Sequence, residues 1–256
     1  MPLDSRQVAR AAMMRHSPFE WLRGPASYDR ASGELSLASD KSERYFPSDE
    51  DAILPDLAAI SAPADAVAFV QRYGLLTKGP NDEDLHEPFS EIRDEAEMLW
   101  LYLRLYEVLC RADRGDDNAV RELRQLWFRR LDEAAQRLKM GSRPPEDDEE
   151  LTRWCRDFLG WMTNEGMRGT EWVVVSEAAG WSLSGWPPDL LSHAYQQLAF
   201  LMVEKRPVRV CEECGRVFVI EHGRQRFCNS VCSGRTRNRR WREAAGERLG
   251  EEKHNG

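Results

Sequence analysis

Four cysteines near the C-terminus have the residue type and the spacing that bind a metal ion. Two residues separate Cys211 from Cys214, thirteen follow, and three separate Cys228 from Cys232. Two close pairs with a short spacer are typical of a tetrahedral zinc site, whereas a redox Cys-x2-Cys alone would leave the second pair unexplained. Four thiolates fill the coordination shell, so we expect one structural Zn²⁺ with no open position for a reactive water.

The residues around the pairs indicate how the site is built. Gly215 suits a tight turn after the first pair because glycine tolerates positive φ. The β-formers Val217–Ile220 predict a hairpin between the pairs, and the chain turns helical from Cys228, which places Cys232 in the first helical turn. Knuckle, hairpin and helix together predict a treble-clef-like module. His222, in the spacer, is the alternative ligand.

The same stretch is basic although the whole chain is acidic. Residues Glu204–Arg242 hold 11 Lys and Arg against 4 Asp and Glu, a local charge of +7 in a chain of net charge −8. On a helix, Arg235, Arg239 and Arg242 share one face, and arginine forks suit phosphates and guanine edges. We expect Trp241 to cover the small zinc core. The candidate nucleic-acid contacts are Arg224, Arg226, Arg235, Arg237, Arg239, Arg240 and Arg242.

The tail resembles the CGNR-type zinc finger of bacterial transcription regulators. The likeness consists of the first cysteine pair, the strand Val217–Val219, the aromatic step Phe227-Cys228, the Cys-x3-Cys pair and the Arg-rich helix. After Cys232 this chain has Ser-Gly-Arg where the family has Gly-Asn-Arg. The resemblance covers about the last fifth of the chain and implies DNA binding behind an N-terminal sensory domain.

The remainder of the chain predicts an α+β fold in two parts. Residues 1–203 form a mostly helical sensing or docking domain with short β-hairpins, and residues 204–256 form the zinc module. Apolar spacing and punctuating Gly and Pro residues predict these elements. They are a hairpin at Ser32-Gly33, helices from Pro63 to Gly74, 90–112 and 120–141, a helix from Leu151, a hairpin over 170–183 and a helix opened by Pro187-Pro188.

Composition excludes some classes of protein. No apolar run is long enough to span a bilayer and no secretory leader is visible, so we expect a cytoplasmic location and no membrane partner. Cys110 and Cys155 lie on apolar helical stretches and are expected to pack as small hydrophobes. No phosphate loop, serine elbow or HExxH motif is present, which favours a protein that is not an enzyme.

The leading hypothesis is therefore a DNA-binding transcriptional regulator with an N-terminal sensory or dimerisation domain. RNA stays open as the ligand, because an arginine helix does not distinguish it from DNA. A homodimer would supply the specificity that one finger lacks. A small-molecule signal could bind near Trp172, Trp181 and Trp186. The alternative is a non-enzymatic interaction module whose arginines bind a protein partner or the chain's own acidic domain. A nuclease using Glu221 and His222 is a third reading.

Overall fold

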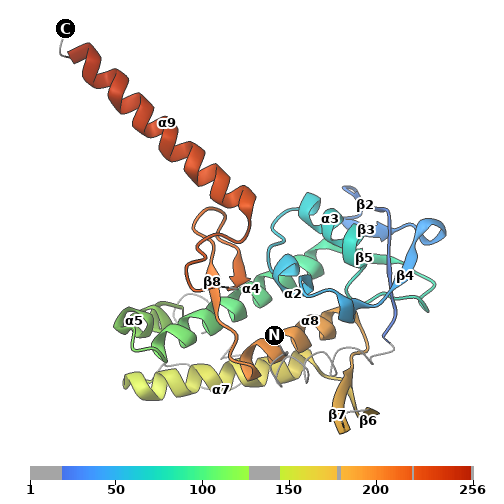
Figure 1. The fold of residues 1–256 in the computed structure, drawn as a ribbon. Coiled ribbons are helices and arrows are strands. Elements are labelled where there is room, and N and C mark those ends of the chain that lie inside the picture. The colour runs from blue at the N-terminus through green and yellow to red at the C-terminus, as the bar shows by residue number, and fades with distance from the viewer. Residues whose placement is uncertain (1–18, 127–144, 178–179, 221, 255–256) are drawn as a thin grey trace.

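The computed structural model describes residues 19–126, 145–177, 180–220 and 222–254. In these residues helices and small antiparallel sheets build one body, from which the last helix projects (Figure 1). The expected mixture of helix and strand is confirmed. None of the helices in the described ranges combines the length and the apolar character that a bilayer crossing requires.

The N-terminal part combines two small sheets with short helices. The predicted hairpin is confirmed, and Gly33 at its turn has a φ of 77°, a left-handed conformation that costs glycine little. The sheets pair β1 with β4 and order the second sheet β2-β3-β5. The elements are β1 (Trp21–Arg23), β2 (Ala26–Asp29), β3 (Glu34–Leu37), β4 (Glu43–Tyr45), β5 (His86–Pro88), 3₁₀ turns Ser39–Lys41 and Pro47–Asp49, α2 (Ile53–Leu57) and α3 (Pro63–Tyr73).

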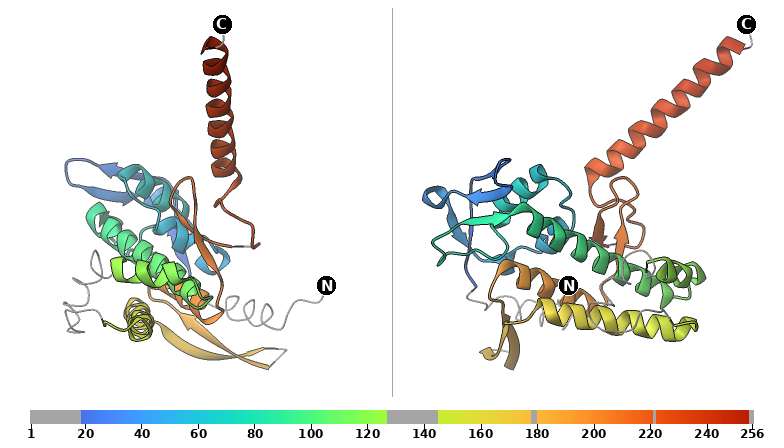
Figure 2. Two further views of the ribbon diagram at one scale, coloured as in Figure 1. Left: turned by 90° about the vertical axis from the view of Figure 1, so that its left-hand side faces the viewer. Right: turned by 180° about the vertical axis from the view of Figure 1, so that it is seen from behind.

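The long helix α4 (Phe89–Ala112) is the centre of the body. Its sequence is apolar almost all round, and side chains such as Leu99, Tyr102 and Leu105 are fully buried. α2, α3, α5 and α7 pack against it, and α8 packs against α7 (Figure 2). The prediction of a central buried helix is confirmed.

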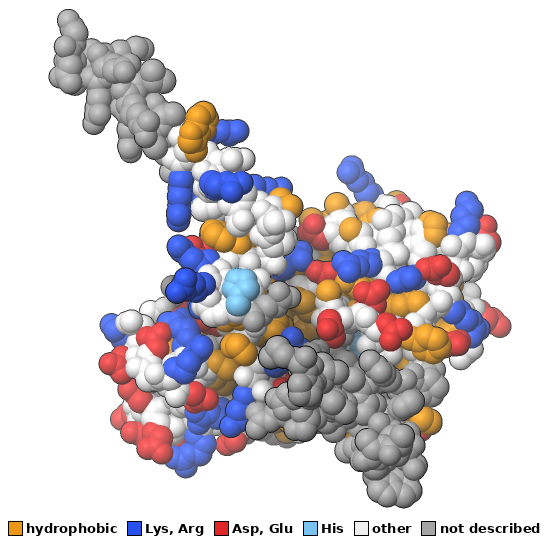
Figure 3. All heavy atoms as spheres, in the orientation of Figure 1, with side chains coloured by type: hydrophobic (Ala, Val, Ile, Leu, Met, Phe, Trp, Pro, Cys, Tyr) orange, Lys and Arg blue, Asp and Glu red, His pale blue; other side chains and the backbone are white. Residues whose placement is uncertain are grey.

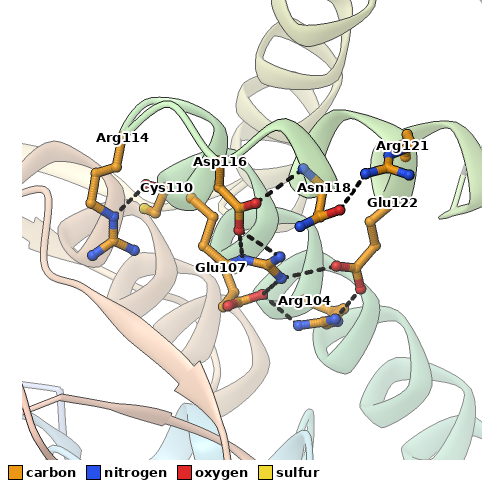
Figure 4. A network of polar contacts seen from close by, with 9 residues as sticks. Arg104, Glu107, Cys110, Arg114, Asp116, Asn118, Arg121 and Glu122 are labelled. Atoms are coloured by element: carbon orange, nitrogen blue, oxygen red, sulfur yellow. Dashed lines mark hydrogen bonds and ion pairs between the residues drawn. The ribbon is translucent and has the colours of Figure 1, made fainter.

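A polar network fastens α5 (Asp117–Leu126) to α4 (Figure 4). Glu107, which is almost fully buried, pairs with Arg104, and Arg104 also pairs with Glu122. Arg111 reaches Asp116 at 2.7 Å and Glu122 at 2.9 Å. Burial raises the pKa of Glu107, and the two arginines oppose that rise. The predicted continuation of this helix to Gly141 lies outside the described residues.

Two further helices and a hairpin complete the body. α7 (Asp148–Gly166) begins where the Asp147 carboxylate accepts the Glu150 N–H at 2.8 Å. β6 (Glu171–Glu177) and β7 (Gly180–Trp186) form the expected hairpin, somewhat longer than predicted. α8 (Leu190–Val203) is capped by Asp189, which accepts the Ser192 N–H at 2.7 Å. The two prolines therefore precede the helix and do not form its first turn, because Asp189 takes the capping position.

The C-terminal module joins this body without a break in packing. β8 (Val208–Val210) pairs with β9 (Val217–Val219), and Val208 and Val217 belong to the main core. The hydroxyl of Tyr106 on α4 donates to the Leu201 carbonyl at 2.8 Å and the Arg206 carbonyl at 3.0 Å. α9 (Ser230–His254) then extends away from the body in every view (Figures 1 and 2). The division of the chain at residue 203 stays a prediction.

Candidate metal centre and adjoining basic helix

The four predicted cysteines meet at one point. Their Sγ atoms all lie within 4.8 Å of one another, and Cys228 Sγ is 3.6 Å from both Cys214 Sγ and Cys232 Sγ. Ligands about 2.3 Å from a tetrahedral ion lie about 3.8 Å apart, so these separations suit one metal ion. The residues could thus hold a metal ion with four protein ligands and no open position.

The first pair lies in a turn between β8 and β9. Gly215 has a φ of 71°, as its predicted role requires, and its N–H donates to the Cys211 carbonyl at 3.0 Å. Burial disfavours the Cys211 thiolate, but backbone N–H groups around the cluster outweigh this and lower its pKa to about 7. Burial instead raises the pKa of Cys228 and Cys232. Because the thiolate is the metal-binding form, a cation at the centre of the cluster would favour ionisation of all four thiols.

The second pair is positioned by the start of α9. The Asn229 side chain accepts the Cys232 N–H at 2.9 Å, which caps the helix and fixes Cys232 in its first turn as predicted. One turn later, the buried Thr236 hydroxyl donates to Glu213 at 2.8 Å. Glu213 belongs to the first pair's turn, so this hydrogen bond ties the two halves of the site together.

The hairpin differs from the expectation. β9 pairs with β8, which precedes Cys211, so the strands flank the first cysteine pair and do not both lie between the pairs. The pairing follows from packing, since Val208 and Val217 can then reach the main core together. The spacer is instead held by Arg209, whose guanidinium donates to the Gln225 carbonyl at 2.6 Å.

The core around the cluster is small and does not include the tryptophan. Phe218 packs with Cys211 and Cys232, both buried, and Phe227 lies beside them. Trp241 is 72% exposed, so the prediction that it covers this core is wrong. Trp241 is nine residues from Cys232, which places the two on opposite sides of a helix. Cys110 and Cys155 pack with the main core as expected.

Two of the seven candidate arginines are engaged within the module. Arg226 forms two hydrogen bonds with Glu212, and Arg239 lies 2.9 Å from Glu213. These pairings hold the pKa of both glutamates below its usual range, with the Thr236 hydroxyl contributing most at Glu213. Glu212 and Glu213 lie inside the Cys-x2-Cys turn, and that position is the signal in the sequence that could have predicted the pairing.

The other candidates are exposed. Within the described ranges no ion pair is formed by Arg224, Arg235, Arg237, Arg240 or Arg242. Arg237, Asn238 and Trp241 lie on the side of α9 away from Cys232 and Thr236. Arg235 and Arg242 are exposed as well, so the contact face expected from Arg235, Arg239 and Arg242 stays a prediction. Lys and Arg side chains gather over the module and the first half of α9 (Figure 3).

One arginine that the sequence did not single out joins the module to the body. Arg216 lies 2.8 Å from the carboxylate of Asp56 on α2. The same carboxylate accepts the Tyr73 hydroxyl at 2.7 Å and contacts Arg72. Local sequence gives no sign of this contact, because it joins residues 160 positions apart.

Comparison with known proteins gives no relative: no protein-family model, curated protein or solved structure matches this chain. The site is therefore interpreted from its own geometry. His222 is exposed and lies outside the cysteine cluster, which leaves four thiolates as the candidate ligands.

Proposed function

We propose that this chain is a zinc-finger nucleic-acid-binding protein that acts as a DNA-binding transcriptional regulator. Zn²⁺ would be held by Cys211, Cys214, Cys228 and Cys232, since an all-thiolate tetrahedral donor set suits zinc and lacks a position for catalysis. The observation that carries the proposal is α9, whose first turn is fixed by the cluster while exposed arginines extend into solvent.

The chemistry of the exposed face supports a nucleic-acid partner. Arg237 and Arg242 form no ion pair within the described part of the chain and can neutralise phosphates, while Asn238 could read a base edge. Trp241 could stack on an unpaired base, a contact that single-stranded DNA or RNA offers. A homodimer in the cytoplasm would add a second helix and lengthen the recognised site.

The test is fluorescence anisotropy of a labelled random-sequence duplex against the metal-loaded full chain, titrated across salt. Changing both Arg237 and Arg242 to Ala should reduce the slope of log affinity against log salt by about 0.9 for each lost phosphate contact. Arg30→Ala with Arg153→Ala is the matched control, because these arginines are exposed on the body and remove the same charge. Equal slopes in the two double variants would contradict the assignment to α9.

The second candidate is a protein-interaction module, and the engaged arginines favour it. Arg226 and Arg239 already have carboxylate partners, and the exposed Trp241 and Val231 offer apolar contacts on the same helix. Parallel titrations with duplex DNA, single-stranded DNA and RNA of one sequence distinguish nucleic-acid binding from protein binding. Absence of binding to all three at low salt would exclude the nucleic-acid proposal and favour this one.

A further inference from the structure

A cleft lies beside the packed junction, between the cysteine turn of the C-terminal module and the body. Its volume is about 1130 Å³, which is large enough to hold a small molecule. One wall is formed by α4 with Tyr195 of α8, Met162 of α7 and residues 58–61 before α3, and the other by the cysteine turn and the first turns of α9. Two arginines line the module's side: Arg216, whose charge is paired with Asp56, and the exposed Arg235. Two polar groups in the body's wall of this cleft, on Glu95 and Tyr102, could bind a ligand.

Glu95 lies half-buried in that wall without a counter-ion. Its carboxylate accepts one hydrogen bond, from the Tyr195 hydroxyl at 3.2 Å, and within the described residues no Lys, Arg or His forms an ion pair with it. Burial raises the pKa of Glu95, and the neighbouring Asp94 and Asp189 raise it further. A carboxylate held away from water among other acids is stabilised when a cation binds beside it.

Tyr102 supplies a second unsatisfied group. It lies two helical turns after Glu95, on the same face of α4, and its side chain is fully buried. Its hydroxyl has no hydrogen-bond partner among the described residues, and Tyr102 is one of the residues that line the cleft. A buried hydroxyl without a partner costs free energy that a ligand able to bond it would recover.

Apolar side chains lie beside these two groups. Met98 lies between Glu95 and Tyr102 on the same face of α4, and Leu101 and Met162 line the cleft with it. Of the other carboxylates that line the cleft, Asp65 accepts hydrogen bonds at the start of α3, Asp94 pairs with Arg93, and Glu97 is exposed. Glu95 is therefore the half-buried acid of this wall.

We propose that this cleft binds a small organic cation, with a protonated amine beside Glu95, a hydrogen bond to the Tyr102 hydroxyl and an apolar body against Met98 and Met162. The site does not depend on nucleic-acid binding, because it is built from residues of the body and is tested by ligand binding alone. It also lies apart from Trp172 and Trp186, neither of which is among the described residues that line the cleft.

The experiment uses three probes of one shape on the metal-loaded full chain: 2-phenylethylammonium, the neutral 2-phenylethanol and the anionic 3-phenylpropanoate. Calorimetry should give about tenfold tighter binding for the ammonium than for the alcohol, because its hydrogen bond to a carboxylate is charge-assisted. With methionine methyl groups labelled for NMR, the ammonium should shift the signals of Met98 and Met162.

Variants locate the binding. Glu95→Gln keeps an acceptor for Tyr195 and should abolish the preference for the ammonium, whereas Glu91→Gln, one turn earlier and exposed on the same helix, should leave it unchanged. Tyr102→Phe keeps the ring packing and should weaken ammonium binding severalfold. The proposal is overturned if the ammonium does not bind at about 10 mM, a concentration that detects the weakest affinity expected for this size. It is equally overturned if Glu95→Gln and Glu91→Gln bind the probes alike.

Discussion

Acidification should destabilise this protein through one buried histidine. His193 on α8 is 3% exposed, its ring lies 6.0 Å from that of Phe19, and its Nε2 is 3.3 Å from the Gln197 amide nitrogen. Burial lowers the pKa of His193 from 6.5 to about 4, although hydrogen bonds at the ring oppose that shift. The imidazole is therefore neutral in the native state at neutral pH.

The direction and size of the change in unfolding free energy follow from the difference between the native and unfolded pKa of His193. Below pH 6.5 His193 is protonated in the unfolded chain but stays neutral in the native state, so the free energy of unfolding falls as the pH drops from 6.5 towards 4. A difference of about 2.5 pKa units limits the total loss to about 3 kcal/mol, and about 2 kcal/mol of it falls between pH 7 and pH 5.

Urea unfolding followed by tryptophan fluorescence at pH 7, 6 and 5 measures this loss. His193→Gln should be less stable than the native chain at pH 7 but should lose about 2 kcal/mol less between pH 7 and pH 5. Carboxylate and thiolate titration is common to both proteins and cancels in the comparison. If both proteins lose stability equally over this range, the burial argument for His193 is refuted.

Four further predictions concern the metal site and the ion pairs. Removing the metal with a chelator should release α9 from its fixed first turn and reduce the helical circular-dichroism signal. The β8–β9 hairpin should stay packed through Val208 and Val217. An unchanged spectrum would contradict a structural metal. Glu213→Ala and Arg239→Ala, with the double variant, should give a coupling energy in urea unfolding of about 0.5–1 kcal/mol, because Arg239 is half-exposed; additive effects would show no interaction. Glu213→Ala should also free Arg239 and steepen the salt dependence of DNA binding, which anisotropy would measure against Glu204→Ala as an exposed control. Glu107→Ala leaves Arg104 and Arg111 partly unpaired in a buried setting and should cost about 3 kcal/mol in urea unfolding at pH 7, against less than about 1 kcal/mol for the exposed Glu91→Ala.

The features that were predicted correctly are those that depend on residues close together in the sequence. The apolar sequence of α4 gave a central helix, Ser32-Gly33 gave a hairpin turn, and cysteine spacing gave the cluster. Each depends on residues close together in the chain. Partners distant in sequence could not be predicted in this way: β9 could pair on either side, and the choice of β8 follows from contacts that Val208 and Val217 make with the core.

The site required a second kind of information, namely which side of α9 faces the cysteines. Once Cys232 is a ligand, Thr236 must face inward and Trp241 outward, because four residues nearly repeat a helical face and nine reverse it. The exposed position of Trp241 could therefore have been predicted from the sequence alone. Glu95, which forms no ion pair within the described residues, carries no such local sign, because its surroundings are supplied by α7, α8 and the C-terminal module together.

The stability of the fold does not explain why α9 exposes arginines and a tryptophan. Its described side chains that face the module are Cys232, Thr236 and Arg239, and these suffice to anchor the first turns. A helix extending into solvent gains nothing from an exposed tryptophan, and adjacent arginines repel one another. Within the described residues Arg237 and Arg242 form no ion pair, and Trp241 is 72% exposed. An anionic partner with flat apolar faces would fit their charge and shape, as the proposed nucleic-acid binding requires.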